Sequence, residues 1–320
     1  MNTRNIVILI TVLALLGGSL WYRKTSMPPK DLVTADSLRA FVPETLDLKS
    51  VDAVELARPD GPVIRLERTN GQWLLPGLGG APANGQSVTG LLDALQEMRG
   101  EFRSSDPGLV DDYGLSDDEA LRLSLFSAGV EHVRLLFGKG DFRNLFLRTA
   151  DSAEVFVAPG VILGRMGAHS QTLSEQFWID TGLLSLNWED IQELRLTTPN
   201  ETASLKRVAG NGEGNATVLD AWEFFQNKGE GLTQARLEDA LTVLDRVSVH
   251  EALPTDSAER EKLDAPTHRL EIVTTSGLIT LEAVKEETGA LIRRAGSPHI
   301  YRMHDTVFDR LFPSPSPDAE

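Results

Sequence analysis

Few side chains in this sequence could carry chemistry, and the histidines come first. The six are His132, His169, His250, His268, His299 and His304, and none stands in an H-E-x-x-H pattern or another local metal-binding spacing. His299 and His304 are close along the chain, across the expected end of a strand and start of a helix, so their side chains could meet in space. Two separate, exposed histidines are the simpler interpretation.

Acidic side chains are densest at Asp111, Asp112, Asp117, Asp118 and Glu119. A calcium loop of the EF-hand type needs alternating oxygen ligands, a central glycine and a distant glutamate. This spacing does not supply that order, whereas Ser116 to Glu119 fits a capping box. We interpret the cluster as a solvated loop with one capped helical turn.

Motifs for nucleophilic and phosphate chemistry are absent from the sequence. It contains no cysteine, no G-x-S-x-G elbow and no S-x-x-K. Phe137 to Asp141, FGKGD, resembles a phosphate loop only superficially, because it stands between two expected strands and so predicts a hairpin turn. We therefore assign no catalytic, cofactor-binding or metal-ligating residue.

The charge distribution bears on possible partners. The formal net charge of the 320 residues is −16, yet residues 1–30 hold four basic residues and no acidic ones. The rest of the chain therefore carries 27 basic and 47 acidic residues. A surface this acidic repels phosphate backbones, which argues against nucleic acid as a partner.

Residues 1–24 are predicted to form a transmembrane anchor. Ile6–Trp21 is a nearly continuous apolar run, flanked by basic residues on both sides and by aromatic residues at its end. A span needs about 20 apolar residues, and such flanking side chains extend a short run. No A-x-A-like site follows, which favours an uncleaved helix over the alternative, a cleaved signal peptide. We expect a single-pass inner-membrane protein with its bulk in the periplasm and a proline-containing linker at 25–50.

The elements that must position any site are repeated along the chain. Phe146–Met166 and Leu291–Leu311 align without a gap at an offset of 145 residues, and both read as strand, turn, strand and short helix. The comparison extends to residues 51–167 and 191–312, and every insertion falls in an expected loop. The prediction is an α+β protein with two tandem homologous domains. A bridge at 168–190 joins them, and a disordered tail follows at 313–320.

Each predicted domain is a mainly antiparallel sheet with one amphipathic helix packed on it. The helices are expected at Ser87–Arg99 and Thr233–Arg246, where apolar residues recur at helical spacing. Trp73 and Trp222 take equivalent strand positions, which favours core packing under the helix over ligand stacking. In the bridge, Trp178 and Trp188 are candidates for joining the two domains.

Three short motifs carry a family resemblance: Val51–Leu56 (VDAVEL), Asn70–Leu74 (NGQWL) and Tyr113–Leu115 (YGL). With the N-terminal anchor and the leucine-rich helix, the chain resembles the bacterial family called domain of unknown function 4340. The usual proline soon after YGL is absent here. The resemblance implies a membrane-anchored protein that partners ABC-type export systems, including those akin to gliding-motility transporters, and it implies no catalytic residue.

The sequence therefore favours a non-enzymatic, membrane-anchored extracytoplasmic accessory or scaffold protein, with an ABC transporter subunit as its expected partner. A first alternative is a binding module for a cell-envelope glycan or peptide that uses the cleft between the domains. A hydrolase is a remote alternative, because many carboxylates always offer pairs for such chemistry.

Overall fold

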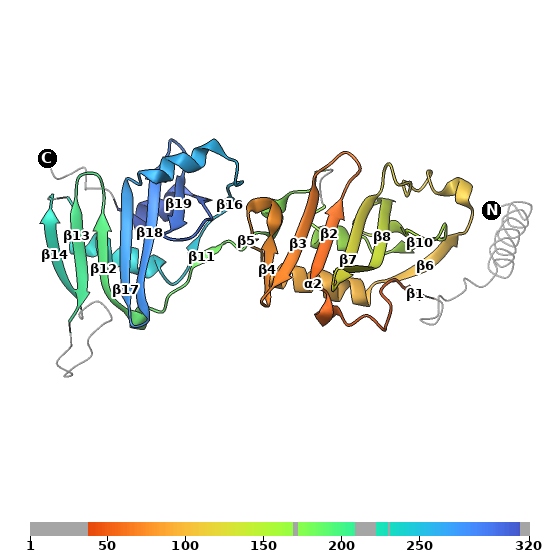
Figure 1. Ribbon diagram of the computed structural model, residues 1–320, viewed down its shortest axis with the longest axis horizontal. Helices are drawn as coiled ribbons and strands as arrows, with labels where there is room; N and C mark the ends of the chain where they lie inside the picture. Colours follow the sequence, from red (N-terminus) through yellow and green to blue (C-terminus); the bar gives the residue numbers. More distant parts are fainter. Residues whose placement is uncertain (1–37, 169–171, 209–221, 230, 314–320) are drawn as a thin grey trace, which may run out of the picture.

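The computed structural model describes residues 38–168, 172–208, 222–229 and 231–313. They form two lobes placed end to end along the long axis of the molecule (Figure 1). Every strand pair of these residues is antiparallel, and a few helices pack on the sheets. The fold is therefore sheet-rich α+β, as the alternating apolar pattern predicts.

The first lobe is organised around a ten-stranded sheet with the order β1-β6-β10-β9-β8-β7-β2-β3-β4-β5. Its strands are β1 (Arg39–Ala40), β2 (Ala53–Ala57), β3 (Val63–Thr69), β4 (Gln72–Leu75), β5 (Ala81–Pro82), β6 (Arg99–Ser104), β7 (Leu121–Ser127), β8 (Val130–Gly140), β9 (Leu145–Thr149) and β10 (Val155–Ala158). Asn70 and Gly71, with φ of 51° and 82°, make the predicted tight turn between β3 and β4.

The second lobe is organised around an eight-stranded sheet with the order β14-β13-β12-β17-β18-β19-β20-β16. Its strands are β12 (Ile191–Thr197), β13 (Thr202–Arg207), β14 (Trp222–Lys228), β16 (Glu251–Ala252), β17 (His268–Thr274), β18 (Gly277–Lys285), β19 (Ala290–Arg294) and β20 (Tyr301–Met303). A separate pair joins β11 (Gly182–Leu184) to β15 (Val247–Ser248). Residues 209–221, between β13 and β14, lie outside the described residues.

The two sheets follow the same path. From β6 to β4 the first sheet runs β6-β10-β9-β8-β7-β2-β3-β4, and the second, from its other end, runs β16-β20-β19-β18-β17-β12-β13-β14. Each strand of one series takes the same place in the chain order as its counterpart. The hairpins β9–β10 and β19–β20 belong to the segments that align in the sequence.

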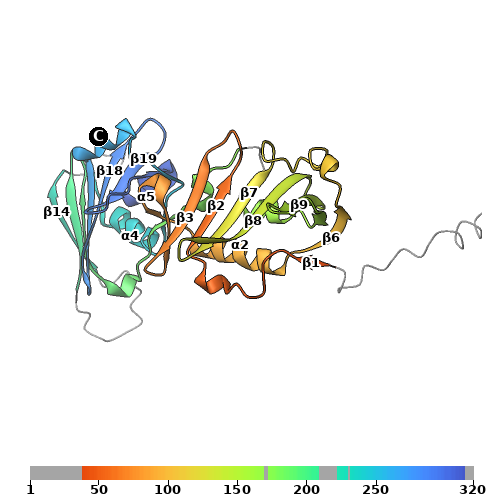
Figure 2. The same cartoon turned by 45° about the vertical axis from the view of Figure 1, so that its right-hand side comes forward.

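Helices cover one face of each sheet (Figure 2). They are α2 (Gly85–Glu97), α3 (Ile162–Arg165), α4 (Gln234–Val243) and α5 (Asp305–Leu311), with 3₁₀ helices at Leu48–Ser50, Pro76–Leu78, Pro107–Leu109, Glu175–Trp178, Trp188–Asp190 and Ala258–Asp264. The Asn84 side chain accepts from Ser87 N at 3.0 Å and caps α2. Both main helices end before their predicted limits, because Arg99 begins β6 and Val247 begins β15.

The opposite face of each sheet carries a smaller apolar cluster. In the first lobe, Leu115 of the YGL motif is fully buried with Leu136 and Val155. In the second lobe, Leu263 is fully buried with Leu291 and Ile300. The sequence alignment places Leu115 and Leu263 at equivalent positions, and the structure gives both the same role.

The bridge between the lobes is hydrogen-bonded to both of them. Backbone bonds join Trp178 O to Asn84 N at 2.7 Å and Asp180 N to Pro82 O at 2.9 Å in the first lobe. Farther along, β11 pairs with β15 of the second lobe. Within the bridge, Glu175–Trp178 forms a 3₁₀ turn, and the chain then becomes extended at Ile179 to pair with Ala83.

Several predictions concern residues at the ends of the chain. The predicted anchor at 1–24 lies outside the described residues, and no helix among the described residues is long and apolar enough to cross a membrane. The expected linker at 25–50 is packed from Arg39 onward, where β1 pairs with β6 and Phe41 is buried. The first lobe therefore begins before residue 51. Of the predicted tail, Pro313 is buried and the rest is not described.

Candidate functional site

The structure separates most of the histidines. His304 stacks on His250, with ring centroids 4.0 Å apart and an angle of 17° between the planes. His299, which the sequence suggested as a neighbour of His304, instead lies before β20 and is partly buried. Burial, and next the positive charge of His304, lower the pKa of His250 below its usual 6.5. His169 lies outside the described residues.

The acidic loop and the FGKGD segment have structural roles. The five carboxylates of the loop are all exposed, and Arg148 donates to Asp117 at 3.2 Å. Lys139 lies at the end of β8, in the predicted hairpin, and its backbone N and Nζ both donate to carbonyls of the YGL loop. Among the described residues, no three His, Asp or Glu side chains come together as metal ligands.

The tryptophans fill space between elements. Trp73 and Trp222 are both 6% exposed and belong to the core, as their equivalent strand positions predict. Trp178 is fully buried within the bridge, and Phe177 packs edge-on against it at 5.0 Å. Trp188 is 36% exposed, and Arg207 lies over its ring. Trp178 therefore fills the junction and is not available to a ligand in a cleft between the lobes.

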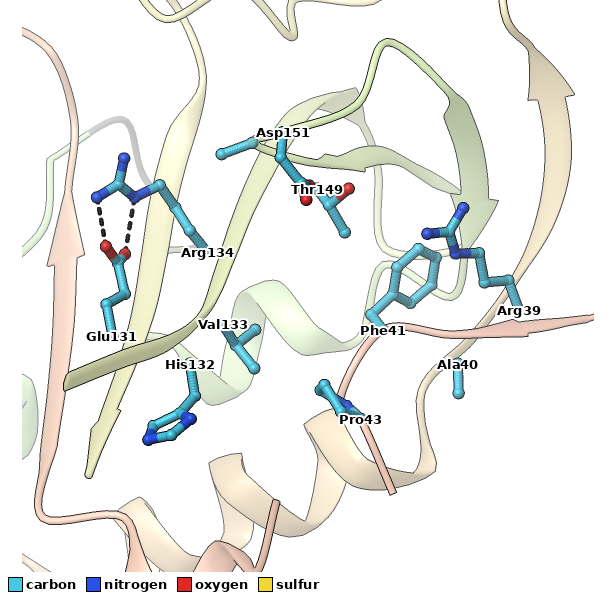
Figure 3. A pocket seen from close by; sticks show the side chains of 11 residues that line it. Arg39, Ala40, Phe41, Pro43, Glu131, His132, Val133, Arg134, Thr149 and Asp151 are labelled. Carbon is cyan, nitrogen blue, oxygen red and sulfur yellow. Dashed lines mark hydrogen bonds and ion pairs between the residues drawn. The ribbon is translucent and has the colours of Figure 1, made fainter. Parts of the chain in front are cut away.

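A pocket of about 570 Å³ lies at the end of the first lobe where β1 enters the sheet (Figure 3). β1, β8 and the turn after β9 supply its walls. Phe41 and Val133 provide apolar surface, and Thr149 and Asp151 provide oxygen atoms. Its volume falls within the range of small-molecule sites.

Both arginines of this pocket are paired with carboxylates. Arg39 pairs with Glu154 and lies over the Phe156 ring at 5.1 Å. Arg134 donates through Nε to Glu131 at 2.7 Å, the pair marked in Figure 3. The pocket combines apolar surface with paired arginines, and this geometry suits contact with a partner or a small ligand.

The second lobe carries an ion-pair network beside the stacked histidines. Arg302 lies among Glu251, Glu259 and Glu286, at 2.7 Å from the last. Lys262 also contacts Glu286, at 2.5 Å. Sequence reasoning missed this network, because its members come from β16, a 3₁₀ helix, the β18–β19 turn and β20. Both cations of the network are paired with carboxylates, and its exposed ion pairs contribute little stability each.

Together the fold and these surfaces define a two-lobed, sheet-rich α+β protein with a filled junction. Within that class, the chain belongs to the family described as "Domain of unknown function (DUF4340)", whose model matches residues 73–266. The match includes Trp73, the YGL motif and the whole bridge, and begins after Val51–Leu56. No curated protein and no solved structure gives a significant match.

Proposed function

We propose that this chain is a membrane-anchored extracytoplasmic accessory or scaffold subunit of an ABC-type export system, without enzymatic activity of its own. The observation that carries the proposal is the junction between the lobes. Backbone pairing to both lobes and the buried Trp178 join them into one elongated body. Such a body suits a subunit that spans a distance between partners, whereas a clamshell binding protein needs a hinge.

The placement of the proposed anchor agrees with this role. The apolar run Ile6–Trp21 precedes the first lobe, and the chain enters the fold at β1. The segment 25–38 extends at most about 50 Å. The pocket beside Arg39 is lined by β1, which lies at the end of the first lobe away from the second lobe (Figure 1), so we expect this surface to face a membrane partner.

We further propose that residues 51–167 and 191–312, which make up most of the two lobes, are tandem homologous domains that arose by duplication. Their common strand order supports this origin. So do the equivalent roles of Leu115 and Leu263 in the outer clusters. Duplication of a sheet domain with divergent polar surfaces supplies two different contact faces in one chain.

Purification of the tagged full-length chain from native membranes in mild neutral detergent tests the proposal. We expect an ATP-binding subunit and a membrane-spanning permease to accompany it in stoichiometric amounts. A chain lacking residues 1–24 is the matched control and should lose membrane association and the partners. Protease added outside the inner membrane should cleave the lobes. Full-length protein that always emerges alone, or that is protected from the protease, contradicts the proposal.

A further inference from the structure

The outer face of the second sheet contains a carboxylate held between two arginines. Arg269, Glu282 and Arg293 are direct cross-strand neighbours on β17, β18 and β19. Arg269 Nη2 donates to Glu282 Oε1 at 2.9 Å, and Arg293 Nε donates to Glu282 Oε2 at 2.8 Å. Glu282 is only 8% exposed. Both of its oxygens are thus satisfied by guanidinium groups, which is the usual arrangement for a buried carboxylate.

The first lobe has a corresponding row of three cross-strand neighbours, but this row lacks the carboxylate. Arg122, Leu136 and Arg148 are direct cross-strand neighbours on β7, β8 and β9, which are the counterparts of β17, β18 and β19. Leu136 therefore takes the position of Glu282. The two arginines are kept, while the acidic side chain that neutralises them in the second lobe is missing.

The two arginines of this row differ in their partners. Arg148 is committed to the YGL loop, because its Nε donates to Leu115 O at 2.9 Å and its Nη2 to Asp117 at 3.2 Å. Arg122 is exposed and makes no hydrogen bond or ion pair to any described residue. Its positive charge acts on Glu131, but that carboxylate is already paired with Arg134. Arg122 is thus a cation without a committed partner.

A pocket of about 340 Å³ opens beside Arg122. Arg58, which follows β2, also lines it, as do Arg134 and Asp117. The Nε atom of Arg58 is buried with no hydrogen-bond acceptor among the described residues. A buried donor left unpaired is costly and indicates a missing acceptor. Three guanidinium groups gathered in so acidic a chain distinguish this pocket from the rest of the surface.

Apolar side chains form the remaining wall. Ala57, Leu136 and Ala150 face the pocket, and Val63 at its edge is 54% exposed. An anion held by the arginines would thus have apolar surface beside it. Arg58 and Arg122 are the groups free to bind it, since Arg134 is paired with Glu131.

We propose that this first-lobe pocket binds a ligand with a carboxylate next to a short apolar group, with Arg58 and Arg122 as the residues that bind the carboxylate. The second lobe supplies the comparison within the same chain, since it places the carboxylate of Glu282 between two arginines at the position of Leu136. The proposal is independent of the export role, because it rests on this face of the sheet alone.

The test uses the full-length chain in neutral maltoside detergent, labelled with nitrogen-15 at arginine only. Acetate, hexanoate and inorganic phosphate are titrated, and the side-chain Nε–H signals of arginine are followed by nuclear magnetic resonance. Arg58→Lys and Arg122→Lys identify the two signals. We expect hexanoate to give saturable shifts at both, with at least several-fold tighter binding than acetate. No saturable shift, or saturation by phosphate alone, overturns the proposal.

Two reciprocal variants use the second lobe as an internal control. Leu136→Glu installs the missing carboxylate and should abolish binding of hexanoate. Glu282→Leu removes the resident carboxylate and should create a second site, seen as new saturable shifts at Arg269 and Arg293. Arg65→Lys, at an arginine of the same sheet already paired with Glu55 and Glu67, should leave binding unchanged. If Leu136→Glu does not fold, the Glu282→Leu variant decides. Absence of hexanoate-dependent shifts at Arg269 and Arg293 in that variant contradicts the proposal.

Discussion

Replacement of Trp178 should separate the contribution of its ring from that of its polar atom. Trp178 is the most deeply buried tryptophan that the structure describes, with no exposed surface. Its indole N–H has no hydrogen-bond partner among the described residues, although buried tryptophans usually find one. The side chain thus stabilises the bridge through apolar contact while carrying an unsatisfied donor.

In Trp178→Phe, the loss of apolar burial and the removal of the unpaired N–H nearly cancel. The lost ring carbons remove about 2 kcal/mol of apolar burial. Removal of the unpaired N–H recovers about 1–3 kcal/mol. The free energy of unfolding should therefore change by no more than about 1 kcal/mol. Trp178→Ala loses the whole ring and should cost about 3–5 kcal/mol.

Urea denaturation of the full-length chain, followed by circular dichroism, measures these differences through the midpoint and slope of the transition. Trp73→Phe is the matched control, because Trp73 is 6% exposed and has no buried unpaired N–H. It should lose about 2 kcal/mol. If Trp178→Phe is as destabilising as Trp73→Phe, the unpaired donor contributes nothing and the reasoning is refuted.

Three further changes test other contacts. Gln176→Ala removes two hydrogen bonds between the bridge and the backbone of Ala252 in β16, at 2.8 and 2.9 Å. It should lower the free energy of unfolding by about 1–3 kcal/mol in the same urea assay, and an unchanged midpoint would show that these bonds do not hold the bridge to the second lobe. Burial lowers the pKa of His250 in the folded protein below 6.5. As the pH falls, His250 is therefore protonated in the unfolded chain at a higher pH than in the folded protein, and the free energy of unfolding should decrease below pH 6.5. The slope from this one group is at most about 1.4 kcal/mol per pH unit, and His250→Gln should flatten the measured pH dependence. Gly160→Ala would place a Cβ 1.7 Å from Asp141 O and should cost at least about 2 kcal/mol, whereas Gly85→Ala at the start of α2, with 3.8 Å to its nearest neighbour, should be neutral or stabilising; equal thermal midpoints for the two would refute the predicted clash.

The sequence predicted those elements in which the spacing of apolar residues matches the residues that are buried. The helices α2 and α4 lie close to where the helical spacing of apolar residues places them. Their buried side chains face one core, so a period of about 3.6 residues survives in the sequence. Leu115 and Leu263 were matched by aligning the two halves of the sequence, and each is fully buried in the outer cluster of its lobe.

The exposed strands at the β1 end of the first sheet were missed for the opposite reason. In β6, five of six residues are at least partly exposed, and Phe102 is 51% exposed. Such a strand has no alternating burial to read, and its position is set by pairing with β1 and β10. The same applies to Arg39–Ala40, which the sequence assigned to a linker.

The sequence by itself determined the α+β class, the two aligned halves and the absence of a recognisable catalytic motif. Only the tertiary structure decided which charged side chains meet. Arg122 and Glu282 are ordinary surface residues in the sequence, because alternation shows their face but not their neighbours. Cross-strand register places Leu136 where the second lobe has Glu282. That register depends on contacts between distant segments, and local spacing cannot encode it.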